Sequence, residues 1–176
     1  MSLFDDEVNP IFAQAFFAGS RNGTIKEFLQ FDYHDPACFY KTLEQDQKEL
    51  DIELTKLSTN MQTFLDQEKN AINDQQVFPE VKFIDLGFRG ETMPFITWII
   101  EFNATFNKGL NEYAAITPEE KLDYNCRSLW TFTEGTRIIK IETPMNYEIC
   151  ENHVAFWASK NDVIGGKEII RFIIKE

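Results

Sequence analysis

The sequence predicts an α+β protein, with N-terminal helices that include one long helix, followed by a mainly antiparallel β-sheet or β-sandwich of about seven strands. Three observations lead to this class. Residues 93–106 alternate between apolar and polar side chains, which is the period of a strand with one buried face. Residues 37–69 contain no Gly or Pro and are rich in Gln, Glu, Lys and Leu, as long helices are. The last third of the chain has short apolar runs separated by turn residues.

The first 34 residues are expected to form short helices. Asn9 can cap a helix that begins at Pro10, and Thr24 with Glu27 has the spacing of a capping box. We therefore predict a helical N-terminal part over residues 1–75 and an antiparallel β part over residues 76–176, which together form one structural unit.

The long helix predicted from Pro36 to Lys69 would reach about 50 Å at a rise of 1.5 Å per residue. Apolar residues follow it at coiled-coil-like spacings. The central part of this leucine seam consists of Leu50, Leu54, Leu57 and Met61. The seam can pack on the sheet or the N-terminal helices of its own chain, or it can contact a protein partner or a second copy. We expect it to form partner contacts, most simply in a two-fold homodimer.

Several strands are predicted in the second part of the chain. Residues 81–88 and 93–106 are expected to form an antiparallel hairpin, with Trp98 and Ile100 nearly fully buried and Thr97 and Asn103 more exposed. A capping box at 117–120 predicts a short helix. The remaining strands are predicted at 128–133, 136–142, 146–150, 153–159 and 168–174.

Composition limits the classes of partner. Lys and Arg number 17 against 29 Asp and Glu, a net charge of −12, which repels nucleic acid and anionic membrane surfaces. No apolar run reaches the roughly 18 residues of a membrane span. The three cysteines are irregularly spaced, and the N-terminus lacks the pattern of a signal peptide. We therefore expect a cytoplasmic protein that binds neither nucleic acid nor membrane.

Residues that could hold a metal are few. His34, Cys38, Cys150 and His153 would be a legitimate tetrahedral zinc set. The two halves lie far apart in the sequence, however, and neither has the spacing of a zinc finger, so a buried thiol with surface imidazoles is the simpler interpretation. No phosphate-binding loop, dinucleotide turn or nucleophile elbow is present. We expect no metal, no cofactor and no catalytic residue.

One carboxylate pair is a further candidate. Asp85 and Glu101 fall in the two arms of the predicted hairpin, so they could meet on one face of the sheet and do acid–base work. Because the chain has 29 acidic residues, chance neighbours of this kind are expected.

The function predicted from the sequence is that of a non-enzymatic binding or assembly protein that acts through protein–protein contacts. The alternative is a small-molecule-binding protein or a metal-dependent enzyme with a pocket between sheet and helix. A cleft with converging polar groups and shifted pKa values would favour the alternative, whereas a flat apolar patch would favour the first.

Overall fold

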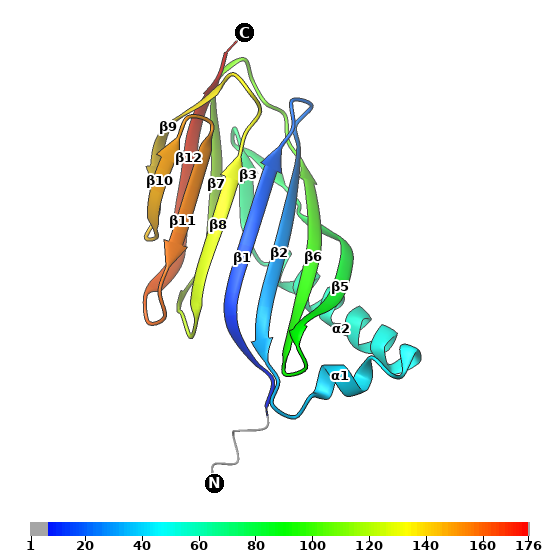
Figure 1. Ribbon diagram of the computed structural model, residues 1–176. Coiled ribbons are helices and arrows are strands. Elements are labelled where there is room, and N and C mark those ends of the chain that lie inside the picture. Colours follow the sequence, from blue (N-terminus) through cyan, green and yellow to red (C-terminus); the bar gives the residue numbers. More distant parts are fainter. Residues whose placement is uncertain (1–6, 176) are drawn as a thin grey trace.

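The computed structural model describes residues 7–175, which form two β-sheets and two helices (Figure 1). The strands are β1 (Asn9–Gly19), β2 (Thr24–His34), β3 (Lys69–Ile72), β4 (Gln75–Val77), β5 (Glu80–Gly90), β6 (Met93–Asn103), β7 (Gly109–Lys121), β8 (Asn125–Thr131), β9 (Thr136–Glu142), β10 (Asn146–Cys150), β11 (His153–Ala158) and β12 (Val163–Ile174). The helices are α1 (Phe39–Leu43) and α2 (Gln47–Leu65). The larger sheet has the order β10-β11-β8-β1-β2-β6-β5, and the smaller sheet has the order β4-β3-β7-β12-β9.

The predicted α+β class with a long N-terminal helix is wrong. Strands make up 60% of the described residues and helices 14%, so this part of the protein is predominantly β. Where two helices were expected, the chain forms the hairpin β1–β2, which lies inside the larger sheet between β8 and β6. β1 runs parallel to β8, whereas the neighbours in both sheets otherwise pair antiparallel.

Strand pairing overrode the capping signals in this hairpin. The Asn22–Gly23 dipeptide, a common hairpin turn, reverses the chain between β1 and β2, and the N–H of Ser20 donates to the carbonyl of Thr24 at 2.9 Å. Along β2, Lys26 and Phe28 are exposed whereas Ile25 is fully buried, which is the alternation of a strand with one covered face.

The helix predicted over 36–69 is divided in two. Asp46 has an extended backbone and accepts hydrogen bonds from the N–H groups of Lys48 and Glu49, so α2 begins only after it. The fully buried Asp35 accepts from Phe39 and Tyr40, both at 2.9 Å, and so fixes the start of α1. Among residues 7–175, neither helix is long and apolar enough to cross a membrane.

Several predictions for the second half of the chain are confirmed. The hairpin of β5 and β6 is confirmed, and β9 and β10 have the predicted bounds. The helix predicted at 117–120 is wrong, because these residues extend β7 and pair with β12. Trp98 and Ile100 are buried and Asn103 is exposed, as expected.

Thr97 is buried, contrary to the prediction. It faces the outside of the larger sheet, where its strand lies between two others, and its partners in register are Asp85 and Gln30. Gln30 is itself buried, with its side chain donating to Asp32. Neighbouring polar side chains, rather than the protein core, therefore remove Thr97 from solvent.

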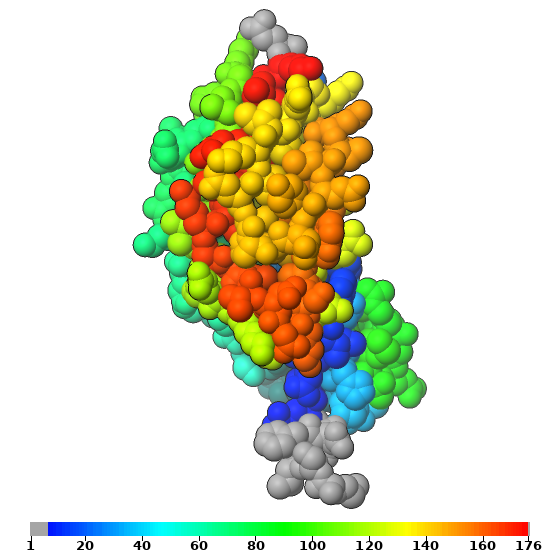
Figure 2. All heavy atoms as spheres, turned by 90° about the vertical axis from the view of Figure 1, so that its left-hand side faces the viewer, coloured from blue at the N-terminus to red at the C-terminus, as the bar shows by residue number. Residues whose placement is uncertain are grey.

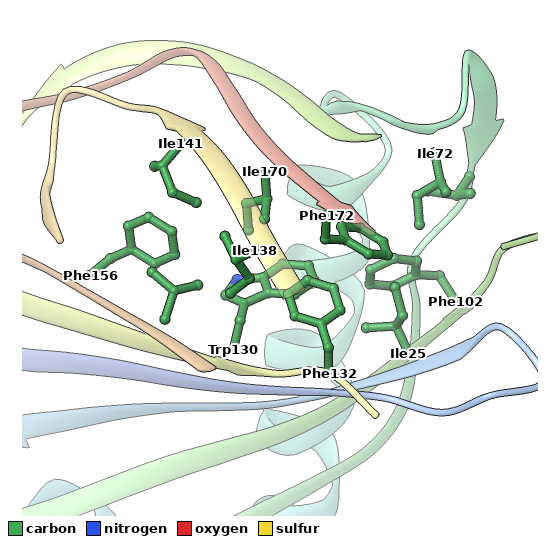
Figure 3. Packing of buried hydrophobic residues seen from close by; sticks show 12 residues of the cluster. Ile25, Ile72, Phe102, Trp130, Phe132, Ile138, Ile141, Phe156, Ile170 and Phe172 are labelled. Carbon is green, nitrogen blue, oxygen red and sulfur yellow. The ribbon is translucent and has the colours of Figure 1, made fainter. Parts of the chain in front are cut away.

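The inner face of the larger sheet has two different covers. At one end the smaller sheet lies against it over a sheet core, shown in Figure 3. This core includes Ile25, Phe102, Trp130, Phe132 and Phe172. At the other end α2 covers the sheet over a helix core, which includes Tyr40, Leu65, Ile96, Trp98 and Ile100.

The leucine seam contributes to the helix core. Leu50 is buried, and Leu54, Leu57 and Met61 pack against the residues of that core. This packing corresponds to the internal alternative that the sequence left open. A partner contact through the same four residues stays a prediction.

The β1–β2 turn offers a test of the fold. Gly23 has a φ of +90°, and a Cβ atom there would lie 1.8 Å from the carbonyl oxygen of Ala104. Gly23→Ala combines backbone strain with this clash, so it should lower the free energy of unfolding by about 2 kcal/mol or more in urea denaturation. Gly135→Ala is the matched control, since Gly135 has a φ of +84° but open space around it. Equal losses in both variants would contradict the close approach of Gly23 to Ala104.

Candidate functional site

A cavity of about 240 Å³ lies between the two sheets. Most of its wall is apolar, with side chains from both sheets. These apolar residues are Ala13, Ala15, Phe17, Leu29, Trp130, Met145, Phe156, Ile164, Ile169 and Ile170. An apolar cavity of about 150 Å³ can bind benzene, and sites for drug-sized ligands begin near 300 Å³. The cavity is therefore large enough for one ring with a short substituent.

Connecting segments form one side of the cavity. Thr143 and Met145, between β9 and β10, and Ile164, at the start of β12, contribute to the lining. Figure 2 looks onto this side, where side chains around residues 140–150 (yellow to orange) lie against those around 160–168 (orange-red). Arg127 and Glu142 are the more solvent-exposed members of the lining, so solvent reaches the cavity here.

Glu168 presents a carboxylate to the cavity in a fixed position. The backbone N–H of Met145 donates to the hydroxyl oxygen of Thr143 at 3.2 Å. The Thr143 hydroxyl in turn donates to Oε1 of Glu168 at 2.6 Å. This chain orients one oxygen of Glu168, while no hydrogen bond from residues 7–175 engages the other.

A second hydrogen-bonded chain reaches the cavity through Tyr113. The Tyr113 hydroxyl donates to Oδ1 of Asn70 at 2.9 Å, and Nδ2 of Asn70 donates to Oε2 of Glu68 at 3.0 Å. Glu68 lies between α2 and β3, so this chain connects the end of the helix to the middle of the smaller sheet. Asn70 is buried, and its amide is satisfied on both sides.

Glu27 lies on the inner face of β2, between Ile25 of the sheet core and the cavity residue Leu29. No hydrogen bond or ion pair to its carboxyl group is found within the described part of the chain. Burial, with a smaller contribution from the charge of Glu68, raises its pKa to about 8. Glu27 is therefore mostly protonated at neutral pH.

The polar groups around Tyr113 disfavour negative charge. Burial raises the pKa of Tyr113 well above its usual value, and the charges of Glu27, Glu68 and Glu168 add to that rise. Burial also raises the pKa of Glu68, against a lowering by its hydrogen bond from Asn70. We call Glu27, Glu68 and Glu168 the carboxyl cluster. Its members come from three separate segments and act on the same phenol.

Glu142 differs from the three members of the carboxyl cluster, because its carboxylate is paired with cations. This carboxylate also lines the cavity, but Lys140 lies 2.6 Å from it and Arg171 lies 3.3 Å from it. The hydrogen bond from Lys140, with smaller effects of both cations, lowers the pKa of Glu142. Arg171 also pairs with Glu112, so its guanidinium is shared between two carboxylates. Lys140 and Arg171 therefore pair with Glu142, whereas Arg127, which also lines the cavity, forms no ion pair within residues 7–175.

The structure does not bring the candidate metal ligands together. His34 ends β2 beside Asn9, whereas His153 pairs with Thr131 near the opposite end of the sheet. Cys38 precedes α1, and Cys150 pairs with His153. No group of three or more His, Cys, Asp or Glu side chains in residues 7–175 is placed to hold a metal ion.

The carboxylate pair from the sequence is not a site either. Asp85 stands opposite Thr97, and Glu101 stands opposite Glu80 and forms an ion pair with Lys26 at 3.7 Å. Sequence reasoning missed the carboxyl cluster. Its one local signal was Glu27 between Ile25 and Leu29, a charged residue on the apolar face of an alternating segment.

Comparison with models of protein families finds none that matches this chain, and no curated protein matches it.

The raised pKa of Glu27 predicts a pH-dependent stability. The folded state keeps a proton on Glu27 up to about pH 8, whereas the unfolded state releases it near 4.5. Between these values the unfolded state binds fewer protons, so the free energy of unfolding falls as pH rises. Glu27→Gln removes this effect and should be more stable than the parent by about 1–3 kcal/mol at pH near 8, and by less near pH 5.

Urea denaturation across that pH range measures the difference. Glu148→Gln makes the same chemical substitution on the exposed strand β10 and serves as the control. Parallel pH profiles for Glu27→Gln and the parent would contradict the burial of an unpaired carboxyl group at this position.

Proposed function

We propose that the protein binds a small, largely apolar molecule in the cavity between its two sheets. The observation that carries this proposal is the cavity itself, where an apolar wall is combined with a few polar groups from different strands. Ligand sites commonly have this composition, with apolar area for affinity and sparse polar groups for orientation. The shifted pKa values of Glu27 and Tyr113 support it further, since such shifts concentrate at functional sites.

The proposed activity is binding without catalysis. Cys126 lines the cavity, but burial raises the pKa of its thiol, which disfavours the nucleophilic thiolate. Thr143 and Tyr113 each donate their hydroxyl hydrogen to another side chain and are held in place by it. These groups are suited to orient a bound molecule.

We also propose a cytoplasmic location. The three cysteines, Cys38, Cys126 and Cys150, are free, as is usual in a reducing compartment. The net charge of −12 is unsuited to contact with anionic membrane surfaces.

Ethylbenzene is a suitable neutral probe, because it has the one-ring size that the cavity admits. In the parent protein it should shift the methyl resonances of Leu29, Met145 and Ile170, which line the cavity. Ala15→Leu places additional carbon atoms in the cavity and should abolish these shifts. Ala18→Leu is the matched control, because Ala18 lies on the outer face of the same strand, opposite the exposed Lys26. Absent shifts in the parent, or equal shifts in Ala15→Leu, would overturn the proposed cavity function.

A second candidate function is self-association, which the sequence also favoured. An apolar row crosses the outer face of the larger sheet, with each member directly opposite the next in register. It consists of Phe83, Ile99, Phe28, Phe16 and Leu129. Three of these, Phe83, Phe28 and Phe16, are 58%, 40% and 41% exposed.

A row of this kind supports contact with a second copy, since two equivalent rows can stack about a two-fold axis. Light scattering at tens of micromolar should then give a dimer mass, and Phe28→Glu should return the mass to that of a monomer. Leu54→Glu with Leu57→Glu tests the leucine seam in the same way. A monomer mass for the parent protein would exclude both contacts.

A further inference from the structure

We propose that two copies of the protein pack face to face through the outer face of the larger sheet, about a two-fold axis parallel to β2, and that Arg127 of each copy pairs with Asp85 of the other. The inference rests on the self-association proposed above as the second candidate function. It adds the orientation of the two copies and the residues that fix it. Three features carry it: the arrangement of five strands about β2, two unpaired opposite charges and the size of the apolar face.

The outer face of the larger sheet carries the apolar row next to a row of polar side chains. The strands β8, β1, β2, β6 and β5 lie side by side towards the viewer in Figure 1, with α2 behind them. Two residues further along each strand, a second set of side chains stands in register across the same five strands. We call this set the polar row; it consists of Arg127, Gln14, Gln30, Thr97 and Asp85.

The two ends of the polar row carry opposite charges. Arg127 on β8 and Asp85 on β5 are both exposed, and neither forms an ion pair within residues 7–175. Arg127 also touches the cavity, but its side chain lies on the outer face, because Trp130, three residues further along β8, faces the sheet core. Four strand spacings, about 19 Å in all, separate the two charges, so they cannot pair within one copy.

β2 lies midway between these two charges, since β8 and β5 are each two strands away from it. A two-fold axis parallel to β2, between two facing sheets, therefore places Arg127 over Asp85 of the second copy, and the same contact occurs again on the other side of the axis. Packed sheets are about 10 Å apart, a distance that an Arg and an Asp side chain span together. Lys26 of β2 would face its own equivalent, but the carboxylate of Glu101 lies 3.7 Å from its ammonium group and balances its charge.

The apolar row is self-complementary about the same axis. Phe28 lies on the axis and meets its own equivalent. Ile99 lies over Phe16 of the second copy, one strand away from the axis. Phe83 lies over Leu129 of the second copy, two strands away. The contact is therefore apolar along its centre and has the two ion pairs at its rim, as protein interfaces commonly do.

The face is large enough for a weak dimer. Five strands about 4.8 Å apart and three rows about 7 Å apart cover about 24 by 20 Å, or about 1,000 Å² when both copies are counted. This area is near the lower limit for a specific interface, so we expect a dissociation constant in the micromolar range.

A two-fold axis across the strands, along the apolar row, fits less well. It would place Arg127 over Thr131 of the second copy and Asp85 over Glu80. Two acids would then face each other at each end of the contact, and Arg127 would stay unpaired. Because each copy has a net charge of −12, a contact that pairs Arg with Asp is favoured over one that brings acids together.

Exchange of the two charges tests the arrangement. Arg127→Asp would place two acids in each pair and Asp85→Arg two arginines, so each should raise the dimer dissociation constant about tenfold or more in sedimentation analysis at about 0.15 M salt. The double variant, Arg127→Asp with Asp85→Arg, rebuilds both pairs with the charges reversed and keeps the charge composition of the parent. It should return the dissociation constant to within about threefold of the parent value.

Two controls separate this contact from other effects of the substitutions. Glu148→Arg makes an acid-to-arginine change on the same outer face, but on β10, which lies outside the five strands of the contact. It should leave the dissociation constant within about threefold of the parent value. Because Arg127 and Asp85 are far apart within one copy, any damage that their substitutions do to the monomer would add, so rescue by the double variant requires contact between copies.

The outcomes distinguish the two proposals. A monomeric parent would overturn self-association and this arrangement together. If Phe28→Glu dissociates the dimer but the double charge variant binds no more tightly than the single variants, the arrangement about β2 is overturned while the outer-face contact stands. If Leu54→Glu with Leu57→Glu dissociates the dimer and Phe28→Glu does not, the contact lies on the leucine seam, and the arrangement is overturned while self-association stands.

Discussion

The register between β2 and β6 determines the rest of the structure. It places Ile25 opposite Phe102 and Leu29 opposite Trp98, on one continuous inner face. The smaller sheet covers the first pair and α2 covers the region of the second. Because a shift of one residue would turn each of these side chains outward, both cores depend on the same pairing. Glu27, opposite Ile100, falls at the boundary between the two covers.

This boundary explains why polar groups gather inside an apolar protein. The segment that joins α2 to β3 passes between the two covers and brings Glu68 and Asn70 into that region. Asn70 is satisfied on both sides, and Thr143 holds Glu168. Networks of this kind stabilise a structure only when every member has a partner. The unpartnered carboxyl group of Glu27 is therefore expected to lower the stability of the fold.

The sequence was sufficient where one local signal dominated. The alternation of β6 has a single interpretation, and so have the short apolar runs that became β9 and β10. The sequence led to a wrong prediction where a local helix-start pattern competed with strand pairing. Asn9–Pro10 and Thr24 with Glu27 are genuine helix-start patterns, but their energies, about 1 kcal/mol each, are small beside the pairing of β1 and β2 on both of their sides. Asp46 also contradicted a longer sequence pattern, because its side chain caps the start of α2 and so divides the predicted helix in two.

The carboxyl cluster could not be predicted in the same way. Glu27, Glu68 and Glu168 come from distant parts of the sequence, and only the packing of the two sheets brings them to Tyr113. Among 29 acidic residues, nothing local distinguishes Glu68 or Glu168. The alternation around Glu27 was informative, since a charged side chain between Ile25 and Leu29 must face inward if the segment is a strand. The interpretation of 24–34 as a helix hid that information.

The central position of the β1–β2 hairpin has a consequence for how the chain folds during its synthesis. This hairpin leaves the ribosome well before its two outer neighbours, β6 and β8, so Phe12 can pair with Asn125 only after β8 has been made. Until then both edges of the hairpin present unpaired N–H and C=O groups together with the exposed side chains of Phe16 and Phe28. Pairing between such distant segments is slow, and incomplete sheets associate readily with one another. The nascent chain thus passes through a long interval in which this aromatic-rich hairpin needs protection from other nascent chains.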